Sequence, residues 1–228
     1  MSTEVKAVVT FQAASAAVQE FGVLPLSSFI PDHPSLESIT TKESWHTGLE
    51  TDPWLWRDRF AGEGVAAYGR FFAKKPILIS AALFPLFKLA FGETRSVEER
   101  YAAGLVSKAV VELYRAIEAN PGIDVKSLKK QVGMQEKERK SEFDRALIDL
   151  QASFEVVILG ISERLNEFGN KNGWNSTCYI MADRWLELQG QSLPELSMTE
   201  AQEALFAQLE QQVSPGAFTY LQKVLRKR

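Results

Sequence analysis

The amino-acid sequence predicts an α+β protein that is mainly α-helical. Of its 228 residues, 45% are hydrophobic and 24% are charged, which is enough apolar surface to fold and argues against intrinsic disorder. From residue 96 onward, apolar side chains recur at helical spacing between clear capping residues. Two short runs rich in β-branched residues, 154–159 and 176–181, interrupt these helices and predict a β-hairpin.

The first part of the chain has a less regular pattern. Residues 10–21 predict a helix that Gly22 ends, and Pro25, Pro31 and Pro34 then indicate a long extended stretch. Three further elements are expected before residue 96. They are a helix from Asp52-Pro53 to about residue 61, an N-terminal β-hairpin of residues 65–72 and 77–80, and a helix from Ser80 to about residue 90.

The central part begins with a capping box at Ser96 and Glu99, which starts a helix extending to about Asn120 with a break near Gly104 or Ser107. Asp124 caps a short helix that Gly133 ends, and a longer helix is expected over residues 136–152 before the hairpin. Helix, short helix, turn, longer helix and hairpin form the order of a winged helix-turn-helix. Two more helices are expected after residue 197, the second of them opening at Ser214-Pro215.

Three regions follow from this pattern. Residues 1–95 are an irregular N-terminal region with a tryptophan-rich helix and the hairpin, and residues 96–190 are the winged helix. Residues 191–228 are C-terminal helices that pack on the rest, and we expect one compact unit.

Charge, cysteine content and hydropathy narrow the class of protein. The formal net charge is -3, and Cys178 is the only cysteine, so an internal disulfide and a thiolate zinc cluster are excluded. The N-terminus has no signal-peptide pattern, and the most apolar window, residues 77–87, is shorter than the roughly 20 residues that a membrane span needs. We expect a cytoplasmic protein without membrane contact. No phosphate-binding, dinucleotide or zinc motif is present, so we expect neither cofactor nor metal.

The predicted winged helix offers candidate contacts to DNA. The candidates for DNA backbone contact are Lys137, Lys140, Arg164 and Lys171. Residues 107–150 contain nine cations and eight anions, so the electrostatic attraction to a duplex is weak. Equally open is a solvated helix face in a winged helix that serves as architecture. A continuous positive surface would favour DNA contact, and interrupting acidic residues would favour the architectural role.

A tryptophan-rich run is the other unusual feature, since three of the five tryptophans fall within residues 45–56. One hypothesis is a pocket that stacks a base or another planar ligand, formed by Trp45, His46, Asp52, Trp54, Trp56 and Arg57. The alternative is a structural joint in which Trp54 and Trp56 fill the core and Arg57 pairs with a carboxylate.

Taken together, the helical pattern of residues 107–181, the run from Ser44 to Arg57 and the segment from Tyr68 to Lys75 resemble the AlkZ-related proteins of Gram-positive bacteria. This group is similar to the winged-helix DNA glycosylases of the AlkZ type. The resemblance implies a winged-helix scaffold and contact with DNA or a modified base. Those glycosylases carry a Gln-x-Gln catalytic motif with an apolar middle residue.

This chain departs from that motif. Its only Gln-x-Gln is Gln189-Gly190-Gln191, with glycine in the middle, so no catalytic role is transferred and the catalytic residues stay unassigned. Besides a weaker hypothesis, catalysis on a modified base by Asp52 or His46, two functions remain open. One is a glycosylase-like protein that contacts DNA or a modified base without the catalytic motif. The other is a non-enzymatic protein that binds another protein or a small planar ligand.

Overall fold

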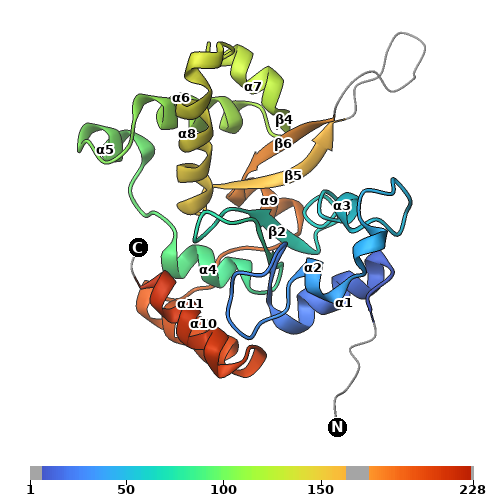
Figure 1. Ribbon diagram of the computed structural model, residues 1–228. Helices are drawn as coiled ribbons and strands as arrows, with labels where there is room; N and C mark the ends of the chain where they lie inside the picture. The colour runs from blue at the N-terminus through green and yellow to red at the C-terminus, as the bar shows by residue number, and fades with distance from the viewer. Residues whose placement is uncertain (1–6, 163–174, 227–228) are drawn as a thin grey trace. The chain divides into compact units, whose positions relative to one another are not determined.

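The computed structural model describes residues 7–162 and 175–226, and the chain divides into two compact units (Figure 1). Unit 1 comprises Met1–Phe91 together with Leu193–Arg228, and unit 2 comprises Gly92–Ser192. Helices predominate, and each unit contains a small antiparallel sheet, so the protein is α+β as the sequence predicts.

Unit 1 is built around a three-stranded sheet of order β1-β3-β2. Helix α1 packs against β1 and β3, while α10 packs along α4 and also contacts α11. Its elements are α1 (Phe11–Phe21), β1 (Val23–Pro25), α2 (Leu36–Ile39), the 3-10 turn η1 (Lys42–Ser44), α3 (Pro53–Trp56), β2 (Ala66–Gly69), β3 (Ile77–Ser80), α4 (Phe84–Phe91), α10 (Met198–Gln212) and α11 (Pro215–Leu225).

Unit 2 has a second three-stranded sheet, of order β4-β6-β5. Helix α6 packs against α5, α7, α8 and β6, and α9 packs on β5 and β6. Its elements are α5 (Val97–Ala102), α6 (Lys108–Ala119), β4 (Ile123–Asp124), α7 (Val125–Gln131), the 3-10 turn η2 (Lys137–Arg139), α8 (Lys140–Ala152), β5 (Val156–Ser162), β6 (Ser176–Met181) and α9 (Ala182–Leu188).

Capping residues determine most of the helix ends that the sequence predicts. Thr10 accepts a hydrogen bond from the Ala13 amide at the start of α1, and Gly22 ends that helix with a φ of 69°. Ser96 and Ser197 form capping boxes, and Asp124 caps α7. The break expected near Gly104 or Ser107 is present between α5 and α6.

The N-terminal hairpin is also confirmed, as β2 paired with β3. Its turn contains Ala73 and Lys74, which both have positive φ values of 53° and 55°. Two successive residues with positive φ form a type I′-like turn, in which the Lys75 amide donates to the Phe72 carbonyl at 3.4 Å; it lies within a longer connection, because β2 ends at Gly69 and not at residue 72 as predicted.

Several predicted boundaries are wrong, each for a local reason. Helix α3 ends at Trp56 instead of residue 61 because the amides of Asp58 and Arg59 bond to carbonyls three residues back, which tightens the backbone into turns. Helix α4 begins at Phe84, since Ser80 belongs to β3. Strand β5 begins at Val156 and not at Phe154, whose φ of 58° is incompatible with a strand.

The extended stretch expected after Gly22 contains two elements that were not predicted. Val23–Pro25 pairs with β3 as an edge strand, and Leu36–Ile39 forms a short helix capped by Ser35. Further along, the segment expected to be one helix over residues 136–152 consists of η2 followed by α8. The segment after β1 and helix α2 matter for function, because Leu26, Ser27 and Glu37 line the pocket described next.

Candidate functional site: an aromatic pocket in unit 1

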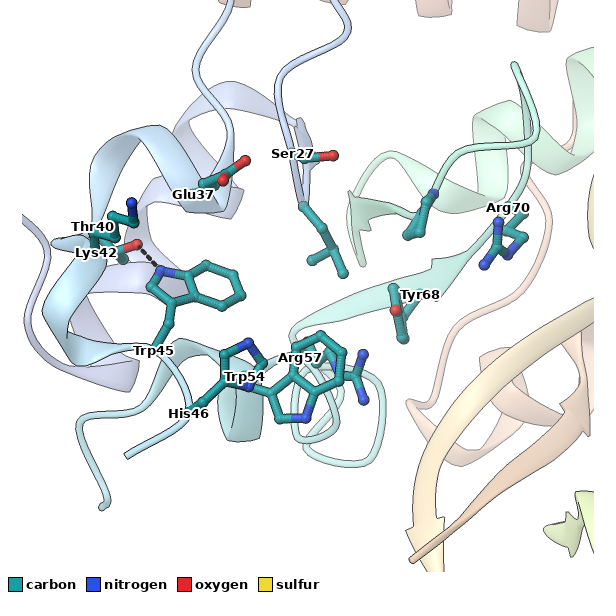
Figure 2. A pocket seen from close by; sticks show the side chains of 12 residues that line it. Ser27, Glu37, Thr40, Lys42, Trp45, His46, Trp54, Arg57, Tyr68 and Arg70 are labelled. Atoms are coloured by element: carbon teal, nitrogen blue, oxygen red, sulfur yellow. Dashed lines mark hydrogen bonds between the residues drawn. The ribbon is translucent and has the colours of Figure 1, made fainter. Parts of the chain in front are cut away.

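Unit 1 contains a pocket of about 790 Å³, a volume within the usual range for small-molecule sites. Three stretches of unit 1 line it: the segment after β1, the segment from α2 to α3, and the β2–β3 hairpin. The lining residues are Leu26, Ser27, Glu37, Thr40, Lys42, Trp45, His46, Trp54, Arg57, Tyr68, Arg70 and Pro76. Figure 2 shows the indole of Trp45 across the pocket from Tyr68 and Arg70.

Asp52 holds the loop that carries the pocket's aromatic residues. Only 1% of its surface is exposed, and its Oδ1 accepts hydrogen bonds from the backbone amides of His46 and Trp54, at 3.0 and 2.9 Å. Its Oδ2 accepts a third bond, of 2.9 Å, from the amide of Gly48. Burial by itself would raise the pKa of this carboxyl, but the three amides outweigh burial and hold the pKa below its ordinary value.

The loop that Asp52 holds has an unusual backbone at His46, whose φ is 62°. A non-glycine residue in this region is strained, and such strain persists only where surrounding contacts enforce it. The Asp52–His46 hydrogen bond is one of those contacts. The imidazole of His46 consequently lies 6.2 Å from the Trp45 ring and 4.8 Å from the Trp54 ring, measured between centroids.

Trp45 is half-buried, and a hydrogen-bond relay fixes its orientation. Its Nε1 donates to the Thr40 hydroxyl at 2.9 Å (Figure 2), and that hydroxyl donates in turn to the Leu36 carbonyl at 2.7 Å. Because the indole is held at its polar edge, it forms a preoriented wall of the pocket.

Arg57 lies beside Trp54 and is held on several sides. Its Cζ is 3.3 Å from the centre of the Trp54 ring, and its Nε is 3.3 Å from Oδ1 of Asp58. Tyr68 is buried, and its hydroxyl is near enough to feel the Arg57 charge. Burial raises the pKa of Tyr68 and of Asp58, and the nearby guanidinium opposes both shifts.

The six residues proposed from the tryptophan-rich run therefore take two different positions. Trp45, His46, Trp54 and Arg57 line the pocket, and Trp54 has 38% of its surface exposed. Asp52 and Trp56 do not line it. Trp56 is fully buried in the core and donates from Nε1 to the Glu50 carbonyl at 2.6 Å, which corresponds to the structural joint.

The other lining residues were not singled out as candidates from the sequence. Glu37, Thr40 and Lys42 belong to the short elements after β1, and Tyr68 and Arg70 belong to the hairpin. Tyr68 and Arg70 lie in the segment from Tyr68 to Lys75 that carries the family resemblance. That resemblance is the one feature of the sequence that could have marked them as pocket residues. Their meeting with the tryptophan-rich run depends on strand pairing across unit 1, and no local pattern encodes it.

Unit 2 contains the residues proposed for DNA contact. Lys137 lies in η2 and Lys140 begins α8, and both are exposed. Acidic side chains interrupt this surface: Glu136, Glu138, Asp144 and Asp149 are among the residues of this segment, and Arg139 pairs with Glu142 at 3.0 Å. Arg164 and Lys171 lie outside the described residues.

Three further features bear on chemistry. Among residues 7–162 and 175–226, no three His, Cys, Asp or Glu side chains gather in a metal-binding group. Within the same part of the chain, no helix combines the length and apolarity that crossing a membrane requires. The Gln189-Gly190-Gln191 sequence lies at the C-terminal end of α9, where Gly190 has a φ of 64°, and it does not line the pocket.

The comparisons with known proteins agree with the resemblance seen in the sequence. A family model described as AlkZ related matches residues 8–226, which is nearly the whole chain. No curated protein and no solved structure matches the chain. On the strength of the family match, the chain belongs to the AlkZ-related family.

Proposed function

We propose that the protein binds a planar heteroaromatic ring of the nucleobase type in the pocket of unit 1. The observation that carries this proposal is Trp45, which lines a pocket of about 790 Å³ and is held in place by its bond to Thr40. The AlkZ-related family adds a relationship to DNA glycosylases, enzymes that act on bases. A base is therefore the planar ring that best fits both observations.

Stacking is the interaction that such a pocket supplies. A base stacked on an aromatic side chain contributes about 1–3 kcal/mol, and the contribution is larger when the side chain is already oriented. Ser27, Glu37 and Thr40 add polar groups to the lining, and a carboxylate such as Glu37 accepts hydrogen bonds from exocyclic amines of bases.

Binding without base excision is the form of the proposal that the geometry favours. Both carboxylate oxygens of Asp52 accept backbone amides and the residue does not line the pocket, so it is poorly placed as a nucleophile or base. The Gln189-Gly190-Gln191 sequence lies in unit 2, outside the lining of this pocket. An assay of base release from alkylated DNA checks this point, and release by the wild type would contradict it.

The experiment that tests binding is a calorimetric titration with the nucleosides adenosine and guanosine. Trp45→Ala should weaken binding by about 5- to 150-fold, which is the stacking contribution expressed as a ratio of dissociation constants. The matched control is Tyr101→Ala, which removes an exposed aromatic side chain from α5 in unit 2 and should leave the affinity unchanged. No heat of binding in the wild type, or equal affinity of the wild type and Trp45→Ala, would overturn the proposal.

Weak DNA contact by unit 2 is the second candidate function. The observation that favours it is the order of α6, α7, α8 and the β5–β6 hairpin, which is the order of a winged helix-turn-helix, with Lys137 and Lys140 exposed. The acidic residues among these lysines limit the attraction, so we propose an auxiliary contact that follows recognition of the base.

A gel shift with duplex DNA at about 50 mM salt tests this second candidate, since non-specific complexes form there at micromolar protein. Replacing both Lys137 and Lys140 with Gln should weaken binding. It should also lower the slope of log affinity against log salt concentration by about one to two, because each lost phosphate contact lowers that slope by about one. Lys223→Gln on α11 is the matched control. Absence of any complex at low salt would remove this candidate and leave the pocket proposal intact.

A further inference from the structure

We propose that the ligand of the unit 1 pocket carries an anionic group, the phosphate of a nucleotide, and that Arg57 binds this phosphate. The inference rests on the proposed function and extends it, because a planar ring alone would need no cation beside the stacking surface. It assigns the pocket to nucleotides, either free or within a single strand, in preference to uncharged rings.

Arg57 has the arrangement of a preorganised anion-binding residue. Its guanidinium lies against the Trp54 ring, with 3.3 Å between Cζ and the ring centre, so its N–H groups point outward in the guanidinium plane. The Asp58 carboxylate, 3.3 Å from its Nε, restrains it further. The side chain is 21% exposed and lines the pocket, so part of it remains accessible to a ligand.

Preorganisation matters because an arginine side chain otherwise loses substantial conformational freedom when it binds a ligand. The contacts with Trp54 and Asp58 already impose that cost in the folded protein. A guanidinium is also the side chain best suited to phosphate, since two parallel N–H groups can bond two phosphate oxygens.

The charges of the residues that line the pocket also favour an anionic ligand. Lys42, Arg57 and Arg70 are the cations among the described lining residues, and Glu37 is the carboxylate; with Asp58, which pairs with Arg57 from outside the lining, three cations still exceed two carboxylates. Within a partly enclosed pocket the water that would screen these charges is reduced, so an excess of cations attracts an anion more strongly than it would on an open surface. Tyr68 and Arg70 lie together on one side of the pocket, across from Trp45 (Figure 2). A ligand with its ring at Trp45 can therefore direct a phosphate toward Arg57 and Arg70.

The test compares a nucleoside with its 5′-monophosphate, adenosine against adenosine monophosphate, by calorimetry at constant ionic strength. The monophosphate should bind the wild type about 10- to 100-fold more tightly, the range expected for a hydrogen-bonded pair of charged groups. In Arg57→Gln this ratio should fall about 10-fold or more, to the small residual preference that Lys42 and Arg70 supply, whatever the variant does to the affinity for the nucleoside. Arg57→Lys, which retains the charge without the planar fork, should give an intermediate ratio and provides a second variant if the first does not fold.

Arg59→Gln is the matched control, because Arg59 pairs with Glu63 and lies over the Phe11 ring, outside the pocket lining. Its ratio should equal that of the wild type. A short single-stranded oligonucleotide forms the third arm of the test. Tighter binding of the oligonucleotide than of the mononucleotide, lost in Arg57→Gln, identifies a strand as the source of the phosphate, and the reverse order identifies a free nucleotide.

The outcomes distinguish a failure of this inference from a failure of the function on which it rests. If adenosine binds but its monophosphate binds no more tightly, the phosphate assignment is wrong while ring binding stands. If neither compound nor the oligonucleotide binds, both proposals fail together. If the ratio of the two affinities is unchanged in Arg57→Gln, Arg57 does not bind the phosphate, and the assignment of this role to Arg57 is wrong.

Discussion

The clearest test of how the pocket is built is the substitution Asp52→Asn. Asp52 is the N-cap of α3, and asparagine is as good an N-cap as aspartate. If capping were its whole role, the substitution would have almost no effect on the free energy of unfolding. The structure gives it a larger role, because the carboxylate accepts three backbone amides and uses both oxygens.

The magnitude follows from what a side-chain amide can and cannot replace. The oxygen of the introduced asparagine can keep the bonds to His46 and Trp54, but its NH₂ group then faces the amide of Gly48, which is also a donor. One charge-assisted hydrogen bond is lost, at about 1.5–3 kcal/mol, and a donor is left without an acceptor. With partial relaxation of the exposed Gly48, we expect a loss of about 2–3 kcal/mol, and a larger loss in Asp52→Ala.

Urea denaturation followed by tryptophan fluorescence measures this loss. Asp124→Asn is the matched control, since Asp124 caps α7 and accepts the Lys126 and Ser127 amides and the Ser176 hydroxyl at one oxygen, Oδ1. Asparagine preserves all three of those bonds, so the loss should stay below about 1 kcal/mol. A loss of less than about 0.5 kcal/mol in Asp52→Asn would refute the role assigned to Asp52 and reduce it to an ordinary cap.

Two further predictions concern the same unit. The pKa of Asp52 is lower in the folded chain than its ordinary value of 3.8, so the stabilisation is present above that value and lost as the pH falls through the folded pKa. The wild type should therefore lose more stability than Asp52→Asn between neutral pH and about pH 3, and parallel pH profiles in urea denaturation would contradict this. Gly22→Ala should destabilise the protein by about 1–3 kcal/mol, because its φ is 69° and a Cβ there would clash with Leu83 and lie 2.6 Å from Oε1 of Gln212. Gly104 has the same φ, but a Cβ added there would meet no atom within 4 Å, so Gly104→Ala measures the cost of the backbone strain alone. We expect a smaller loss of stability in Gly104→Ala than in Gly22→Ala. Equal losses would show that the clash at Gly22 costs nothing.

The sequence predicts those parts of the fold that local chemistry determines. Capping side chains at Thr10, Ser96, Asp124 and Ser197 place helix starts correctly, because each bonds amides within three residues of itself. Strand β1 was missed for the opposite reason. Its stability comes from pairing Val23 with Ile79, which lies far away in the sequence, and its proline hides the pattern of a strand.

The candidate site also has a part that the local sequence predicts and a part that only the packing of the folded chain determines. Trp45, His46, Trp54 and Arg57 are close in the sequence, and they meet because a single carboxylate, Asp52, ties their loop together. The sequence could not distinguish Trp54 from Trp56, because two residues on one turn of helix point in different directions and only the surrounding packing decides which becomes core.

The discontinuity of unit 1 has a consequence for how the chain is made on the ribosome. Helix α4 ends at Phe91, and α10, which packs along it, begins at Met198, so more than 100 residues are synthesised between the two. At ordinary rates of translation this takes about 5–20 s, far longer than a small domain needs to fold. Unit 2 is continuous and can fold within that interval. The end of α4 that contacts α10, where Phe91 packs on Phe206 and the Ala90 carbonyl accepts from Gln202, therefore stays uncovered throughout and leaves apolar surface exposed on the nascent chain.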